Sequence, residues 1–188
     1  MSSKGQKLHP DHVYHIFNRT KGNDLMFTQE RNYQFFLKKY IEYLHPFLDT
    51  YKYYLLDNHF HFLIKIKSEA EIKDYLQTSD FRHKTPSAVD KNCIEIIQLQ
   101  FQRFFGSYAK AFNKQENRPG SLPERPFKRK LIAKESYFGY AVYYIHSNSE
   151  KHGLSTNFRT WQWSSYQSYL SEKETKLKRD FILDWRGR

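Results

Sequence analysis

The sequence predicts an α+β fold: a ferredoxin-like βαββαβ antiparallel sheet with helices packed on one face, followed by a short C-terminal tail. Three observations predict it. Apolar residues switch between a period of two and a period of 3.6, in the order strand, helix, strand, strand, helix, strand, helix. Two of the strands follow each other with only a turn between them, as in an antiparallel hairpin. The length of 188 residues suits a single domain, with a core at about 12–170 and a basic tail at 171–188.

The elements of the first half follow from local pattern. Alternation predicts the first strand, and Thr28 can cap a helix whose apolar positions recur at spacings of three and four until Pro46 ends it. Two further strands flank a turn or bulge at Asp57-Asn58, and the second of them is the most regular period-2 segment in the chain. The expected elements are strand 12–18, helix 28–45, strand 50–56 and strand 59–67.

The second half contains longer helical patterns. A loop at 79–91, with Pro86 and mixed charges, separates a short helix from a long one. Another loop precedes a short basic strand, and a last helix buries Phe138, Ala141, Val142 and Ile145. The expected elements are helix 69–78, helix 92–114, strand 126–133 and helix 135–148.

Composition narrows the classes of partner. Lys and Arg outnumber Asp and Glu by 31 to 20, and the resulting net charge of +11 indicates that the partner of this protein is a polyanion. Nucleic acid is the first expectation, and an anionic membrane surface is its rival. The 15 Tyr and 16 Phe form the core and can also stack on unpaired bases. No stretch of apolar residues is long enough to predict a membrane-spanning helix, and the N-terminus lacks the pattern of a signal peptide. Cys93 is the single cysteine in the sequence. We therefore expect a cytoplasmic bacterial protein without a membrane partner.

The strand HFHFLIKIK carries the clearest chemical pattern. Its side chains alternate, so Phe60 and Phe62 point to one face while His59 and His61 point to the other. The two imidazoles are roughly 6.5–7 Å apart along the backbone, so they can converge on one metal ion. The alternative is a pair of ordinary histidines on a solvated sheet face. Strict alternation, a central strand and basic surroundings favour ligation.

Two histidines do not complete a metal shell. Tyr144 and Asn148 lie four residues apart on the last helix and share a face, so a hydroxyl and an amide oxygen can both reach a site under that helix. Spacing alone does not single out Tyr144, because three other tyrosines stand in the same segment. Lysines on the histidine face and a basic run on the last strand predict contacts with a DNA backbone; these residues are Lys65, Lys67, Arg125, Lys128, Arg129 and Lys130.

Five segments, in order, resemble one family. LLDNHFHFLIKI resembles the "PNHxH" strand of HUH-type single-tyrosine transposases, and AVYYIHSNSEKHGL resembles their "YIxxNPxxxGL" helix. RPGSLPERPFKRKLI, WQWSSYQSYL and YHIFNRTKGN resemble further motifs of the REP-associated tyrosine transposases. The resemblance covers roughly residues 12–170. Asp57 and Ser149 stand where that family usually has proline, and Pro123-Glu124 replaces Phe-Gln.

The resemblance implies roles for particular residues. His59 and His61 correspond to the metal-binding pair, Tyr144 to the nucleophile and Asn148 to a third metal ligand. It implies an enzyme that uses Mg²⁺ or Mn²⁺ to cleave and rejoin single-stranded DNA beside palindromic hairpins, through a covalent 5′-phosphotyrosine. We expect a monomer or a homodimer.

Other functions stay open at this stage. A domesticated relative can bind hairpin DNA or RNA without cutting it, although the presence of His59, His61, Tyr144 and Asn148 favours the enzyme. A phosphodiesterase that activates water needs more carboxylate or histidine ligands than this segment offers. A replication or conjugation nickase shares the chemistry, but such chains are usually longer and often carry three clustered histidines.

Overall fold

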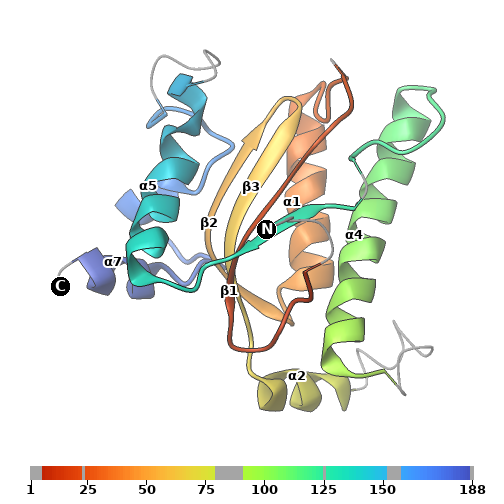
Figure 1. Ribbon diagram of the computed structural model, residues 1–188. Coiled ribbons are helices and arrows are strands. Elements are labelled where there is room, and N and C mark those ends of the chain that lie inside the picture. The colour runs from red at the N-terminus through yellow and green to blue at the C-terminus, as the bar shows by residue number, and fades with distance from the viewer. Residues whose placement is uncertain (1–5, 23, 79–90, 125, 152–157, 187–188) are drawn as a thin grey trace.

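The computed structural model contains one four-stranded antiparallel sheet with helices on both of its faces (Figure 1). It describes residues 6–22, 24–78, 91–124, 126–151 and 158–186. The strands are β1 Val13–Arg19, β2 Leu48–Leu56, β3 His59–Ile66 and β4 Lys128–Leu131. The helices are α1 Glu30–Leu44, α2 Glu69–Leu76, α4 Cys93–Gln115, α5 Glu135–Lys151, α6 Tyr166–Leu170 and α7 Arg179–Arg186.

The strand order confirms the predicted fold class. The sheet runs β2-β3-β1-β4, and every neighbouring pair is antiparallel. This is the order in which a βαββαβ chain places its first and third strands at the centre. β4 is therefore an edge strand, while β3, which carries both histidines of the predicted metal site, is central.

The turn between β2 and β3 is held to the loop before α1. Leu56 pairs with His59, so Asp57 and Asn58 form a two-residue hairpin turn. The Tyr33 hydroxyl donates to Asp57 Oδ1 at 2.6 Å, and the Asp57 carbonyl accepts from the backbone of Met26 at 2.6 Å. Asp57, which replaces a proline of the resembled family, thus fixes the start of β3.

One face of the sheet is covered by α1 and α4, as predicted (Figure 1). The Phe36 ring on α1 lies 5.4 Å from Phe60 on β3 and 4.8 Å from Phe104 on α4, measured between ring centroids. All three side chains are buried. The same face of β3 also buries Phe62, Ile64 and Ile66 in this cluster. The period-2 assignment of apolar residues to this face is confirmed.

The opposite face is covered in part, whereas the expected fold had helices on one face of the sheet only. α5 packs Val142 and Ile145 against Tyr54 of β2 and Leu63 of β3, and all four are buried. The physical reason is that α5 has an apolar side of its own, and burying it against the sheet removes that surface from water. The fold class stands, with α5 added above the histidine face.

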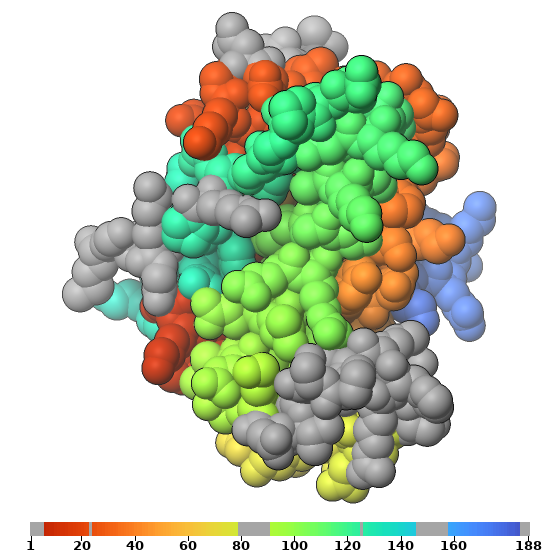
Figure 2. Space-filling model, turned by 90° about the vertical axis from the view of Figure 1, so that its right-hand side faces the viewer, coloured from red at the N-terminus to blue at the C-terminus, as the bar shows by residue number. Residues whose placement is uncertain are grey.

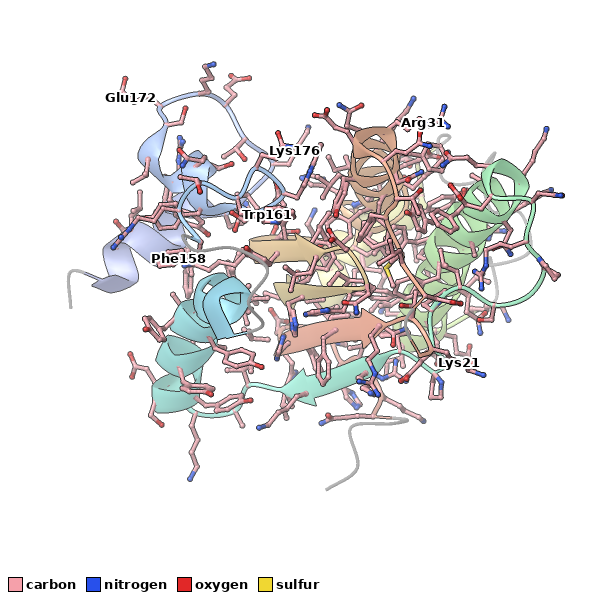
Figure 3. The ribbon with its side chains drawn as sticks, turned by 90° about the horizontal axis from the view of Figure 1, so that it is seen from above. Lys21, Arg31, Phe158, Trp161, Glu172 and Lys176 are labelled. Atoms are coloured by element: carbon pink, nitrogen blue, oxygen red, sulfur yellow. The ribbon has the colours of Figure 1, made fainter. Side chains whose placement is uncertain are left out.

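Helices α6 and α7 of the C-terminal segment pack on the same side as α5, as the view from above shows (Figure 3). Trp161 donates its indole N–H to the Leu55 carbonyl at 2.7 Å, which joins the segment to the edge strand β2. Ile182 of α7 is buried, and Phe181 stacks on Tyr51 at 4.8 Å between ring centroids. The expected basic tail at 171–188 therefore contains a helix, α7, that packs into the buried apolar cluster between α5 and the sheet, which we call the second core. No helix in the described ranges is long and apolar enough to cross a bilayer.

Candidate active site

Both histidines of β3 lie on the face that α5 covers. His61 is buried, with 7 % of its surface exposed, and His59 is half-buried. Their ring centroids are 5.3 Å apart and the rings are nearly perpendicular, at 88°. The predicted side-by-side placement of the two imidazoles is therefore what the structure shows.

A hydrogen bond at Nδ1 orients each of these imidazoles. His59 Nδ1 lies 2.6 Å from Asn58 Oδ1, and because an amide oxygen only accepts, Nδ1 carries the proton and the lone pair is on Nε2. His61 Nδ1 lies 2.9 Å from Nε2 of His15 on β1. Partners of this kind set the tautomer and ring orientation of histidines that bind metals.

His15 belongs to the site, although no sequence pattern assigned it a role there. β1 runs beside β3 so that Phe17 pairs with His61, and His15 and Phe17 both stack against the His61 ring, at 5.1 and 5.9 Å between centroids. Burial, together with the nearby Lys130 charge, lowers the pKa of His15 to about 4. A neutral His15 can accept a hydrogen bond at Nε2 from His61 Nδ1–H, which leaves the His61 lone pair on Nε2.

Tyr144 reaches this cluster from α5. Its ring centroid lies 6.1 Å from that of His61 and 6.3 Å from that of His15, with both ring pairs edge to face. Burial raises the pKa of Tyr144, and Tyr140 and Tyr137 raise it further. The Tyr144 hydroxyl is thus protonated at neutral pH, and positive charge from a bound metal ion or from basic side chains would favour the phenolate.

The metal itself is a prediction. Asn148 lies in α5, but its side chain is outside the part of the chain that the structure describes. Among the described side chains, no three His, Cys, Asp or Glu groups form a metal cluster. Two imidazoles with Nδ1 engaged suit a site completed by oxygen donors, such as water, an amide or a DNA phosphate, and Mn²⁺ accepts that mixed set more readily than Mg²⁺.

The basic residues of β4 divide between the two faces. Lys128 and Lys130 pair with Phe17 and His15, which places them on the histidine face. Arg129 pairs with Ile16 on the opposite face and is only 4 % exposed. Arg125 lies outside the described residues.

The lysines on the histidine face are held by weak surface contacts. Lys128 Nζ lies 3.2 Å from Glu124, Lys65 Nζ lies 3.2 Å from Asp11, and Lys130 Nζ lies 4.0 Å from the centroid of the Tyr137 ring. Exposed pairs of this kind contribute little and exchange readily for a phosphate. Lys65 is four residues from His61, roughly 13 Å along the strand, and Lys67 follows the end of β3. Their contact with DNA stays a prediction.

The depressed pKa of His15 predicts that acidification destabilises the protein. The unfolded chain protonates this histidine near pH 6.5, while the folded chain resists protonation until about pH 4. The neutral His15 side chain therefore makes its full contribution to the free energy of unfolding above pH 6.5. That contribution is lost as the pH falls towards 4, and the loss is about 2 kcal/mol at pH 5. Urea unfolding at pH 7.5 and pH 5 measures this loss, which should shrink in His15→Gln and persist in His12→Gln, a change at an exposed position. An equal loss in His15→Gln would contradict this assignment.

One comparison with known proteins bears on the fold. No family model matches the chain, and no curated protein matches it. A solved structure described as a REP-associated tyrosine transposase bound to a REP hairpin is similar to it, with a TM-score of 0.61. That similarity covers 92 % of this chain and 87 % of the other, at 14 % sequence identity. At this identity the similarity shows a shared fold.

Proposed function

We propose that this chain is a transposase-type endonuclease and strand transferase that cleaves and rejoins single-stranded DNA beside hairpins. The observation that carries the proposal is the convergence of Tyr144 from α5 with His15 and His61 from the two central strands. The likeness to a hairpin-bound transposase supports the same class. A nucleophile beside an oriented imidazole pair is an arrangement for covalent phosphoryl transfer.

The proposed reaction conserves the phosphodiester. Tyr144 Oη attacks the phosphorus, a tyrosine–phosphorus ester bond forms, and the bond to the 3′-oxygen breaks. The proton lost by the phenol balances the one gained by the departing 3′-OH. Attack by another 3′-OH reverses the step and joins a new end, so no external energy source is needed.

His59, His61 and Asn148 would hold a divalent cation in this proposal. A bound Mg²⁺ or Mn²⁺ supplies positive charge that polarises the scissile phosphate and stabilises the 3′-oxygen as it leaves. His15 acts on this site through His61, by holding its ring and its tautomer. Lys128 and Lys130 lie on the same face, where they can bind the phosphates on either side of the scissile bond.

The proposed partner leads to a binding prediction. We expect tighter binding to single-stranded DNA that contains a hairpin than to plain duplex, because stacking on aromatic side chains requires unpaired bases. Binding should weaken with salt, with a slope of about −0.7 in log K per phosphate contact on single strands. Anisotropy titrations over a salt series measure both properties.

A matched pair of variants makes this test specific. Lys130→Ala should reduce the salt slope by about 0.7, while Lys38→Ala, at an exposed position of α1 on the far side of the sheet, should leave it unchanged. Equal affinity for hairpin, linear strand and duplex would reduce the protein to a general polyanion binder. Hairpin binding without any covalent product in the presence of Mn²⁺ would instead identify a binding module.

A further inference from the structure

A second site lies on the opposite side of the sheet from the histidines. A cavity of about 630 Å³ opens between α4 and the β1–β4 edge. Figure 2 shows α4 at the surface with the segment that leads into β4 beside it. Polar side chains from β1, α4 and β4 line the cavity, namely Asn18, Gln98, Gln102 and Arg129, and Glu124 lines it from the segment before β4.

Two of these polar groups are buried with unused hydrogen-bonding atoms. Arg129 is 4 % exposed, its Nε–H has no acceptor, and it forms no ion pair within the described residues. Asn18 is 2 % exposed, and its Nδ2 donates to the Glu124 carbonyl at 2.7 Å, so its Oδ1 is turned away and has no donor. Buried polar groups are normally paired, so an unpaired donor and an unpaired acceptor in one cavity indicate a ligand that supplies both partners.

The remaining walls are flat and apolar. Phe127 and Phe105 line the cavity with their ring centroids 5.3 Å apart, and Pro123 and Pro126 complete the surface. The Arg129 guanidinium lies 4.7 Å from the Phe127 ring centroid. Aromatic and guanidinium planes are surfaces on which a nucleobase stacks.

One carboxylate also borders the cavity. Glu124 lines it, and its carboxylate is kept in place by Arg19 and Lys128, each at 3.2 Å. These contacts hold the pKa of Glu124 below its usual range, with the Lys128 hydrogen bond as the largest cause, so the group stays negative. Glu124 is therefore occupied by its own cations, and the unpaired atoms of Asn18 and Arg129 between aromatic walls suit a planar ligand that presents both a donor and an acceptor.

We propose that this cavity takes one unpaired nucleobase from the single-stranded flank of the DNA hairpin. The inference rests on the proposed function, which supplies the single strand. A paired base is excluded, because its donor and acceptor edge is already used in the duplex. Arg129, which is too buried to meet a DNA backbone, donates to the base instead.

The sheet provides a path from this cavity to the candidate active site. β4 is the edge strand, and its alternation places Lys130 on the histidine face and Arg129 in the cavity. A DNA strand that crosses this edge can bind its phosphates at Lys130 while one base enters the cavity. The bound base would then set which phosphodiester lies beneath Tyr144.

Abasic scanning tests the proposal on the full chain. Each unpaired nucleotide that flanks the hairpin stem is replaced in turn by an abasic residue, and affinity is measured by anisotropy. We expect a loss of about tenfold at one position, the scale of one stacked base. In the double variant Gln98→Ala/Gln102→Ala, and in Arg129→Met, this penalty should fall to about twofold or less, since the variants and the missing base remove the same contacts.

Controls separate the possible outcomes. Gln98 and Gln102 are exposed on α4, so their replacement tests the cavity without disturbing the core, whatever Arg129→Met does to folding. Gln34→Ala, at an exposed position of α1, should keep the full penalty. Hairpin binding with no penalty at any position, or with a penalty unchanged in the Gln98→Ala/Gln102→Ala variant, overturns the cavity proposal alone. Absence of hairpin binding overturns the proposed function as well.

Discussion

Replacement of Tyr144 by phenylalanine is expected to abolish cleavage and the covalent DNA adduct while leaving the fold and hairpin binding intact. The change removes only a hydroxyl from a half-buried ring whose contacts with His15 and His61 are edge to face. The loss of an essential nucleophile lowers turnover by about a thousandfold or more. A denaturing gel of labelled hairpin DNA incubated with Mn²⁺ measures the adduct.

Neighbouring tyrosines on α5 supply matched controls. Tyr143 is 68 % exposed and Tyr140 is 52 % exposed, so a phenylalanine at either position leaves the core unchanged. Tyr143→Phe should retain the adduct in full. Tyr140 stacks on Tyr144 at 5.5 Å between ring centroids, so Tyr140→Phe should alter the rate while retaining the adduct. An adduct that persists in Tyr144→Phe and disappears in Tyr143→Phe would move the nucleophile to Tyr143.

The variants His59→Ala and His61→Ala are each expected to lose metal-dependent cleavage. Either change leaves one imidazole for the cation. Loss of a ligand's hydrogen-bonding partner lowers metal affinity or activity roughly 10–100-fold, and removal of the ligand itself should lower it further. Cleavage should decline likewise when EDTA removes the metal. The readouts are the cleavage rate at increasing Mn²⁺ and the affinity for Mn²⁺ measured by calorimetry.

His12→Ala is the control for these two variants, because His12 is exposed and lies just before β1. Since His61 is buried, thermal unfolding of His61→Ala and of the smaller change His61→Asn separates loss of metal from loss of fold. Cleavage that persists in both His59→Ala and His61→Ala, or that EDTA does not reduce, would end the metal hypothesis.

Much of the fold follows from pattern, because strand alternation and helix period are local properties. The expected strand at 59–67 is β3 at His59–Ile66, and the expected helix at 92–114 is α4 at Cys93–Gln115. Alternation along β3 also assigned the two histidines to the face opposite the aromatic core, as the structure shows. Boundaries shifted most at the basic strand, which was expected at 126–133 and spans Lys128–Leu131.

What the sequence could not show depends on register between distant strands. His15 is 46 residues from His61 in the chain, and only the β1–β3 pairing brings their nitrogens to 2.9 Å. The burial of Arg129 had a local signal, because alternation along β4 turns it away from Lys128 and Lys130. Grouping these residues as one basic run concealed that signal. The packing of α7 depends on the contact of Ile182 with the second core. A hydrophobic period is a local property and does not predict contacts between distant segments.

Mapping the covalent adduct identifies the residue that attacks the DNA. The protein is incubated with single-stranded hairpin DNA and Mn²⁺, digested with nuclease and protease, and the peptide that carries the nucleotide is sequenced by mass spectrometry. We predict a 5′-linked nucleotide on Tyr144, formed with Mn²⁺ and absent with EDTA. A nucleotide on another residue, or cleaved DNA with no attached peptide, would contradict this prediction.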